Sequence, residues 1–240
     1  MENKQSRKIS KRQALREERA RQAQRQRILI IGGIILFVVV IIVLVIASSQ
    51  GGVGEIVEVA PVAYQNENGV KVGDPNAKVV IDVFEDFECS HCKSFNETTE
   101  PLIIAELVDT GKAVYVCHNF PFLTETDSNI SANGAMCAAE QNRLYAYKKI
   151  IFANVKYAVG EFTDKKMIAF ADSLGLDMDP FKQCMSERRY QNAIDADLAL
   201  GEQMGVQGTP SVFVNGVDIS PGLVPTFDQI KAAVEAALNQ

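Results

Sequence analysis

The longest apolar stretch of the chain is ILIIGGIILFVVVIIVLVIA, residues 28–47, and it contains no charged side chain. Twenty residues of helix rise about 30 Å, which is the thickness of the hydrocarbon core of a bilayer. We therefore predict one N-terminal transmembrane helix over 28–47. A cleaved signal peptide is an alternative, although this run and the segment before it are longer than in a typical signal. A buried core helix is a second alternative, but soluble domains rarely contain so long an uncharged run.

A different pattern begins after residue 75. Residues 78–84 (KVVIDVF) and 112–120 (KAVYVCHNF) are short runs rich in β-branched side chains, which is typical of buried strands. Between them, a helix is predicted to begin near the cysteine at position 89 and to end at Gly111, with Pro101 tolerated or causing a kink.

The second half of the domain continues with helical periodicity over about 125–205. Helix N-caps are expected at Ser128, Thr163 and Asp179. Asn215-Gly216 is then typical of a hairpin turn, and PTFDQIKAAVEAALNQ predicts a closing helix. The order strand, helix, strand, helical block, hairpin, helix indicates an α/β domain over 76–240 with a helical insertion. Residues 48–75 are rich in Gly, Ser and Asn and are interpreted as a linker, with a short strand expected near 56–59.

Charge divides the chain at the apolar run. Residues 1–27 carry ten Lys/Arg and three Glu, a net charge of +7, whereas the remainder carries 14 basic and 27 acidic residues, a net charge of −13. By the positive-inside rule, the basic segment is a cytoplasmic tail and residues 48–240 lie outside the cytoplasm. The tail has the charge of a nucleic-acid binder, but its position beside the helix explains that charge as a membrane-apposed tail, so no nucleic-acid partner is predicted.

Cys89 and Cys92 are the residues with the clearest chemistry, because they lie two residues apart where a strand gives way to a helix. Thiol-disulfide exchange needs a cysteine of lowered pKa and a second thiol within reach. At the helix N-terminus, the backbone N–H groups and the dipole would favour a Cys89 thiolate. His91 would stabilise that thiolate further, and Cys92, one turn into the helix, would be the resolving thiol.

Two other interpretations of the cysteine pair remain. Tetrahedral zinc needs two more ligands. Cys117 and His118 are adjacent on a predicted strand and point to opposite faces, so they converge poorly, and no metal site is predicted. A structural disulfide suits a location outside the cytoplasm, but a bridge that closes so short a loop gains little in chain entropy. No bound organic cofactor is implied, since no phosphate-binding or dinucleotide-binding motif is present.

DFECSHC after a β-branched strand, with GVQGTPSVFVNG far downstream and ANGAMCAAEQNRLYAYKKIIFAN between them, resembles the DsbA-like thiol-disulfide oxidoreductases of the thioredoxin-fold superfamily. The resemblance covers about residues 70–240 and implies a thioredoxin fold with a helical insertion. It implies that Thr209-Pro210 is a cis-proline loop opposite the cysteine pair that contacts substrate. Proline lacks an N–H, so the flanking backbone is left to pair with an extended chain.

The chain departs from the family pattern at two positions. Many members have a buried Glu six residues before the first cysteine, where this chain has Val83, and Glu85 has the same strand parity and is a partial substitute. Ser90 stands where a proline is frequent, which leaves the redox potential open.

The other cysteines lie outside the motif. Some relatives have a second disulfide, which Cys137 and Cys184 would form here, and the alternative is two buried free thiols. Cys117 is expected to be a buried, inert thiol, and His118 to be structural.

These observations predict a membrane-anchored, monomeric dithiol oxidase that introduces disulfides into reduced exported proteins. By analogy with the family, a quinone-linked membrane reoxidase of the DsbB or vitamin K epoxide reductase type would reoxidise it. A disulfide reductase or isomerase of the same fold, a non-catalytic client-binding module and a metal-delivery protein are the alternatives.

Overall fold

The computed structural model describes residues 31–41, 53–60, 62 and 64–239. The chain divides into two compact units, Met1–Gly54 and Glu55–Gln240. The predicted cytoplasmic tail, 1–27, lies outside the described residues.

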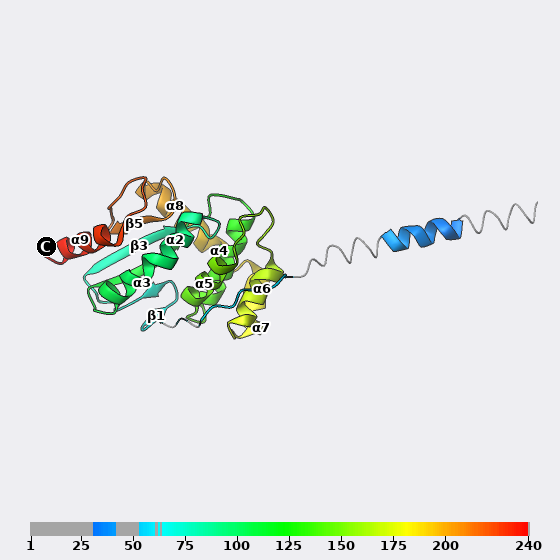
Figure 1. The fold of residues 1–240 in the computed structure, drawn as a ribbon, viewed down its shortest axis with the longest axis horizontal. Coiled ribbons are helices and arrows are strands. Elements are labelled where there is room, and N and C mark those ends of the chain that lie inside the picture. The colour runs from blue at the N-terminus through cyan, green and yellow to red at the C-terminus, as the bar shows by residue number, and fades with distance from the viewer. Residues whose placement is uncertain (1–30, 42–52, 61, 63, 240) are drawn as a thin grey trace, which may run out of the picture. The chain divides into compact units, whose positions relative to one another are not determined.

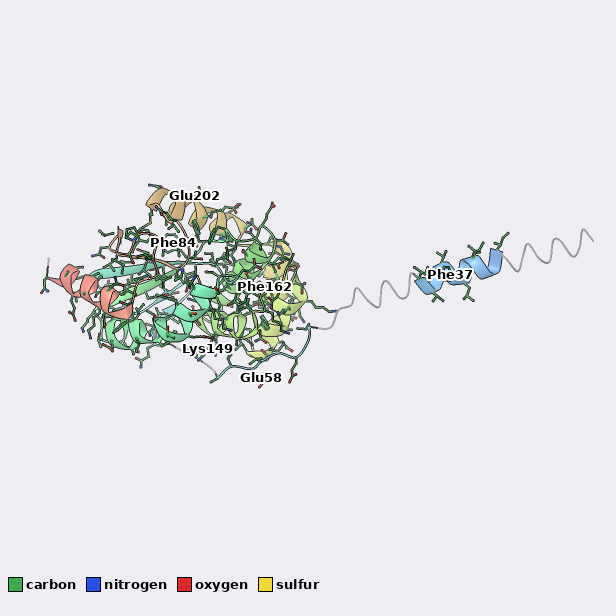
Figure 2. All side chains as sticks on the ribbon, turned by 45° about the horizontal axis from the view of Figure 1, so that its top comes forward. Phe37, Glu58, Phe84, Lys149, Phe162 and Glu202 are labelled. Atoms are coloured by element: carbon green, nitrogen blue, oxygen red, sulfur yellow. A yellow bond between two sulfur atoms is a disulfide. The ribbon has the colours of Figure 1, made fainter. Side chains whose placement is uncertain are left out.

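The described part of the first unit contains a helix over residues 31–41, within the predicted transmembrane run. Its large apolar side chains are exposed, and Phe37 is one of them (Figure 2). Both ends of the predicted run, 28–30 and 42–47, lie outside the described residues. Of the helices that the structure describes, none combines the length and the apolar character needed to cross a membrane.

A six-stranded mixed sheet organises the second unit (Figure 1). Its two longest strands, β3 (Val79–Glu85) and β4 (Ala113–Asn119), are parallel neighbours at the centre. β5 (Ser211–Val214) pairs antiparallel with β3, and β6 (Val217–Asp218) completes that edge. The opposite edge is made by β2 (Lys71–Val72) and β1 (Glu67–Asn68), which are also antiparallel. The sheet order is β1-β2-β4-β3-β5-β6. This is the mixed α/β, thioredoxin-like arrangement that the sequence predicts.

Alternate side chains of β3 belong to two separate apolar clusters. Ile81 and Val83 face the main core, which is also lined by Tyr115 and Cys117 from β4. Phe84 faces the other side, where it forms a smaller cluster with Phe120 and Phe213. Because successive side chains of a strand point to opposite faces, these two clusters lie on opposite faces of the sheet.

Helices cover both faces of the sheet. Three helical elements follow β3 and contribute side chains to the main core: α2 (Ser90–Thr98), α3 (Glu100–Ile103) and the π-helical turn Ile104–Val108. The insertion between β4 and β5 contains α4 (Asp127–Ala139), α5 (Leu144–Asn154), α6 (Asp164–Ser173), α7 (Met178–Glu187) and α8 (Gln191–Met204). The C-terminal helix is α9 (Phe227–Leu238). In Figure 1, α4 to α7 form a group beside the sheet, while α8 packs through Leu198 and Met204 on the Phe84 cluster.

The hairpin between β5 and β6 has the predicted sequence at its turn. Asn215 and Gly216 both adopt positive φ, 47° and 78°. A two-residue turn of this kind matches the twist of the strands that it joins, and few residues other than Asn and Gly adopt that conformation readily. The Asn215 side chain also accepts a hydrogen bond from the Val80 backbone N–H at 2.8 Å.

The segment assigned to the linker from sequence contributes to the folded unit. β1 and β2 fall within 48–75, although both are strands of the sheet. Residues 55–59 form no strand, yet they lie against the insertion, because the Asn154 side chain accepts from Val57 N at 2.8 Å and donates to Val57 O at 2.9 Å. An amide side chain thus takes the place of a neighbouring strand.

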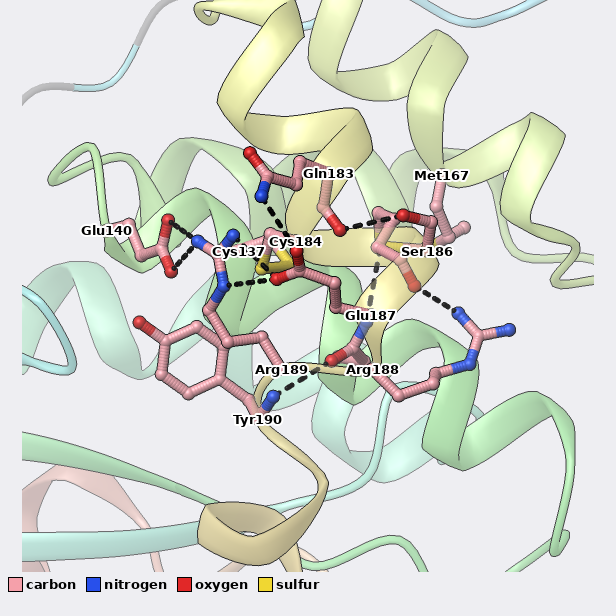
Figure 3. The surroundings of a disulfide bond; sticks show 12 residues. Cys137, Glu140, Met167, Gln183, Cys184, Ser186, Glu187, Arg188, Arg189 and Tyr190 are labelled. Atoms are coloured by element: carbon pink, nitrogen blue, oxygen red, sulfur yellow. Dashed lines mark hydrogen bonds and ion pairs between the residues drawn. A yellow bond between two sulfur atoms is a disulfide. The ribbon is translucent and has the colours of Figure 1, made fainter.

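A disulfide joins two helices of the insertion. Cys137 in α4 and Cys184 in α7 are bonded, with their Cα atoms 5.8 Å apart, and both are fully buried (Figure 3). Beside it, Arg189 contacts the carboxylates of Glu140 and Glu187, at 2.8 and 2.9 Å. The bridge and these ion pairs connect the end of α4 to the end of α7.

Candidate redox site

A turn at the end of β3 positions Cys89. The backbone N–H of Cys89 donates to the carbonyl of Asp86 at 3.0 Å, and Cys89 has extended backbone angles at the N-cap of α2. No acidic residue occupies the first turn of α2. The N–H groups at the start of the helix can therefore stabilise a Cys89 thiolate without competition from a carboxylate in that turn.

The environment of Cys89 strongly favours its thiolate. The hydrogen bond from the Cys92 thiol is the largest influence on the pKa of Cys89, and burial opposes it. The backbone N–H groups of Cys92 and His91 act in the same direction as the Cys92 thiol, and the resulting pKa is about 5. The helix start therefore contributes to the acidity, as the sequence suggests, but the second cysteine contributes more.

Cys92 has the opposite character. Its side chain is fully buried, and burial raises its pKa well above the ordinary value. The hydrogen bond to Cys89 and the charge of Glu85 raise that pKa further. One cysteine of the pair is thus acidic and close to the surface, and the other is buried and protonated. Those properties suit a nucleophile and a resolving thiol, respectively.

Thr209 and Pro210 lie directly against Cys89. The peptide bond between them is cis, and the Thr209 carbonyl accepts a hydrogen bond from the Cys89 thiol at 3.1 Å. A residue 120 positions away in sequence therefore contacts the sulfur. The Thr209 hydroxyl is buried and has no hydrogen-bond partner within the described chain.

A groove of about 570 Å³ opens beside the Cys89 sulfur. His91 is exposed and lines this groove, and its imidazole makes no hydrogen bond to Cys89 among those of the described residues. The remaining lining comes from three loops, and it contains no Asp, Glu, Lys or Arg: Phe122, Leu123, Gln207, Gly208, Thr209, Pro210, Ser211, Gly222, Leu223 and Val224.

A buried ionic cluster lies on the core side of the cysteine pair. The Lys148 ammonium contacts Glu85 Oε2 at 2.5 Å and Glu100 Oε2 at 2.6 Å, and all three side chains are almost fully buried. Tyr115 and Asn96 donate to the Glu100 carboxylate at 2.9 and 3.0 Å. Buried charges persist only when they are paired and hydrogen-bonded, as they are here.

Glu85 is the member of this cluster that acts on the cysteines. Burial raises the pKa of its carboxyl group despite the neighbouring Lys148. Its Oε2 accepts from the Cys117 thiol at 3.4 Å, while Oε1 is buried and has no hydrogen-bond partner among the described residues. Val83 stands at the position of the family's buried Glu, and Glu85 is on the same face of β3 as Val83. Glu85 therefore has the orientation that a substitute for that Glu requires.

Cys117 and His118 point to opposite faces of the sheet. Cys117 is buried beside Glu85, and burial raises the pKa of its thiol well above the ordinary value. His118 lies on the other face, where its ring nitrogens are 3.0 Å from Asp82 and 2.9 Å from Asp197. The side chains that the structure describes include no group of three or more His, Cys, Asp or Glu residues able to hold a metal ion.

Sequence reasoning did not identify Lys148 or Glu100. Both are charged residues on helices, and charged residues are rarely buried fully unless they are paired. Their positions in the helical pattern, on the same faces as apolar residues, are the only signal in the sequence that could have indicated burial.

Comparison with known proteins identifies the class to which this site belongs. A family model described as thioredoxin matches residues 65–236. The chain belongs to this thioredoxin family. It is 26% identical over 182 residues to a probable disulfide bond formation protein D of Bacillus anthracis, covering 74% of this chain and 81% of that protein.

Solved structures agree on the fold. BdbD from Bacillus subtilis, in its oxidised form, superposes with a TM-score of 0.63 at 22% identity, covering 74% of this chain and 97% of that one. DsbA from Chlamydia trachomatis gives a TM-score of 0.62 at 22% identity, covering 76% and 98%. Together with the Cys89-Cys92 site, the family assignment makes this chain a protein disulfide oxidoreductase of the DsbA-like type.

Proposed function

We propose that this thioredoxin-family chain is a dithiol oxidase that introduces disulfides into exported proteins through Cys89 and Cys92. The observation that carries the proposal is the lowered pKa of Cys89, about 5. A stabilised thiolate stabilises the reduced form of the enzyme, and a couple whose reduced form is stable is a strong oxidant. The name of the Bacillus anthracis relative, a probable disulfide bond formation protein, is consistent with that direction.

The reaction takes two exchange steps. A substrate thiolate attacks the Cys89 sulfur of the Cys89-Cys92 disulfide, forming a mixed disulfide with Cys89 and releasing Cys92. A second substrate thiolate then attacks the substrate sulfur of that mixed disulfide, and Cys89 leaves as a thiolate. The substrate loses two electrons and the enzyme gains them. Cys89 is the better leaving group because its pKa is low, and low-pKa thiols leave faster.

The proton that Cys92 takes up in the first step needs a nearby source. Glu85 is close enough to Cys92 for its charge to raise the pKa of that thiol, and its own pKa is raised by burial. Burial thus makes the Glu85 carboxylate a better proton acceptor than an exposed one, and a carboxyl group beside a departing thiolate can exchange a proton with it. We assign Glu85 this proton-exchanging role, and we assign His91 and Thr209-Pro210 to the substrate-facing side of the site.

We place the catalytic domain outside the cytoplasm, held by a single helix over 28–47. The uncharged twenty-residue run and the +7 segment before it support this topology. With the anchor in place, the reduced enzyme stays in the plane of the membrane, where a quinone-linked reoxidase of the DsbB or vitamin K epoxide reductase type would accept its electrons. The chain would act as a monomer.

An oxidative refolding assay tests the reaction. Oxidised protein is expected to restore activity to reduced, unfolded ribonuclease A, and Cys89→Ser is expected to abolish this because no mixed disulfide forms. Ser186→Ala, which changes an exposed residue on α7, serves as the matched control and should behave as the wild type. Equal activity of Cys89→Ser and wild type would contradict the proposal and favour a non-catalytic binding module.

Protease accessibility tests the topology in cells that express the full chain with an N-terminal epitope. Protease added to spheroplasts is expected to degrade the 76–240 domain and to leave the epitope protected. A domain that stays intact until the cells are lysed would contradict the proposed location.

A further inference from the structure

Asp86 is a buried carboxylate that the redox chemistry above does not use. It lies between β3 and Cys89 and is 2% exposed. Burying a carboxylate is costly unless hydrogen-bond donors replace its water. The identity of those donors therefore shows what the residue holds in place.

The donors to Asp86 come from two separate segments. Glu88 N donates to Oδ1 at 2.9 Å, within the turn that delivers Cys89. Phe122 N and Leu123 N both donate to Oδ2 at 3.0 Å, and they belong to the loop between β4 and α4. The Asp86 carbonyl meanwhile accepts from Cys89 N at 3.0 Å. A single residue thus connects the turn that carries the nucleophile to the 122–123 segment.

Ser128 closes the network from the first turn of α4. Its hydroxyl lies 3.0 Å and 2.9 Å from the two carboxylate oxygens of Asp86. Ser128 and Thr124 exchange reciprocal hydrogen bonds, each backbone N–H to the other's hydroxyl oxygen at 3.2 Å. The Thr124 hydroxyl donates to Glu88 Oε2. Every donor in the cluster therefore has an acceptor, which is the condition for a buried polar network to be rigid.

The 122–123 segment presents its side chains to the groove at Cys89. Phe122 is 46% exposed and Leu123 is 45% exposed, although their backbone N–H groups are fixed on a buried carboxylate. Leu223 and Val224 line the same groove. A substrate thiol must enter this groove to reach the Cys89 sulfur, and it finds large apolar side chains and no Asp, Glu, Lys or Arg in the groove lining.

We propose that Asp86 is a substrate-positioning residue, which holds Phe122 and Leu123 as an apolar wall beside Cys89 and so favours polypeptides with a large apolar residue next to the reactive cysteine. This inference rests on the proposed oxidase function and names its substrate class. Asp86 acts through the wall that it fixes and touches neither the reacting sulfur atoms nor the substrate.

Asp86→Asn is the direct test, because it keeps the shape and replaces one acceptor oxygen by a donor. In either orientation of the amide, an NH₂ group faces either Glu88 N or both Phe122 N and Leu123 N, so one side chain no longer holds the Cys89 turn and the wall together. Two dithiol peptides of equal length and spacer serve as probes, one with Leu and one with Ser beside each cysteine. Dithiothreitol serves as a thiol too small to use the wall.

Wild-type protein is expected to oxidise the Leu peptide with a kcat/KM roughly tenfold above that of the Ser peptide, as partial burial of a leucine implies. Asp86→Asn should remove most of this preference by raising the KM of the Leu peptide roughly tenfold, with kcat and the oxidation of dithiothreitol little changed. Asp82→Asn, on the other sheet face, is the matched control: it should lower stability through His118 and keep the peptide preference.

The double variant Phe122→Ser/Leu123→Ser removes the apolar side chains of the wall themselves. Both positions are exposed, so this variant leaves the buried network around Asp86 unchanged. It should lose the Leu preference in the same way. Retention of the preference in Asp86→Asn or in the double variant would overturn the inference. So would an equal fall for both peptides and dithiothreitol, because Asp86 would then act on the thiols themselves. Failure of the wild type to oxidise any of the three thiols would instead overturn the proposed oxidase function, and the positioning role with it.

Discussion

At the scale of single residues, the contrast between the two cysteines is a consequence of position. Cys89 stands at the start of α2, where the thiol of Cys92 and two backbone N–H groups stabilise its thiolate. Cys92 is one turn further on and is surrounded by apolar side chains and the Glu85 carboxylate. The same side chain is therefore acidic at one position and resists ionisation three residues later.

A pH titration of the reduced protein checks this contrast. The thiolate absorbance near 240 nm is expected to rise with a midpoint near pH 5, which is the pKa of Cys89. Cys89→Ser should remove that transition and leave the buried Cys92 protonated at neutral pH. A midpoint near the ordinary cysteine value of about 8.5 would contradict the proposed activation of Cys89.

Glu85→Gln tests the proton-exchanging role. The amide cannot supply a proton to Cys92, so the reaction of the oxidised enzyme with dithiothreitol at pH 7 is expected to slow by roughly tenfold or more. Glu97→Gln, an exposed carboxylate on α2, is the control and should keep the wild-type rate. An unchanged rate in Glu85→Gln would remove Glu85 from the reaction.

The roles of some of these residues can be predicted from the sequence, and the roles of others cannot. Cys89, Cys92 and Thr209-Pro210 lie in short motifs whose residue types state their chemistry, and the structure brings the Thr209 carbonyl to the Cys89 sulfur. Asp86 and Lys148 also lie in stretches that resemble the family, DFECSHC and ANGAMCAAEQNRLYAYKKIIFAN, but their residue types do not state a role. Their roles depend on partners that folding brings from distant parts of the chain, and a local pattern does not record such partners.

At the scale of secondary-structure elements, the α4–α7 disulfide is the main covalent constraint on the insertion. The bridge closes a loop with a sequence separation of 47. In the chain-entropy model, a loop of this length stabilises the fold by about 4 kcal/mol. Cys137→Ala/Cys184→Ala is therefore expected to lower the free energy of unfolding by about that amount, measured by urea denaturation. The double variant should still oxidise dithiothreitol, and a loss of less than about 1 kcal/mol would contradict the structural role.

His118 joins α8 to the sheet, because its two ring nitrogens contact Asp197 of α8 and Asp82 of β3. Burial opposes its protonation, but the hydrogen bonds to Asp197 and Asp82 outweigh burial and raise the pKa to about 9. A histidine with a raised pKa stabilises the fold fully below its unfolded pKa of about 6.5, and this contribution is lost as the pH rises through about 9.

His118→Gln should therefore destabilise the protein by about 3 kcal/mol at pH 6, and by clearly less at pH 9.5, in urea denaturation at the two pH values. His91→Gln, which changes the other of the two histidines, is the control and should show no such dependence. A His118→Gln effect that is equal at both pH values would contradict the charged bridge.

Element boundaries show where local signals are sufficient. Thr163 caps α6 as predicted, through a hydrogen bond from Lys166 N. Ser128 was also expected to be an N-cap, but it lies inside α4, and its hydroxyl donates to Asp86. α2 ends at Thr98, and Pro101 falls in the first turn of α3, so the single predicted helix is divided. The hydrogen bond of Thr163 forms within its own helix, so a local pattern predicts it. The hydroxyl of Ser128 instead bonds to a residue 42 positions away, which a local pattern does not predict.

At the scale of the whole molecule, the folded unit extends further toward the N-terminus than composition suggests. Gly, Ser and Asn in 48–75 indicate a linker, yet β1 and β2 pair in the sheet and Val57 is held by Asn154. Composition indicates only the local conformational preference of a segment. Pairing with a sheet edge, or hydrogen bonding to an amide side chain, can override that preference.

The central claim is that this thioredoxin-family oxidoreductase works as an oxidant. The most direct test is the reduction potential of the Cys89-Cys92 couple, measured by equilibration with glutathione buffers in a variant that lacks Cys117. The stabilised Cys89 thiolate predicts a strongly oxidising value of about −120 mV. A value of about −270 mV, the range of a reductant such as thioredoxin, would contradict the claim and assign the chain to disulfide reduction.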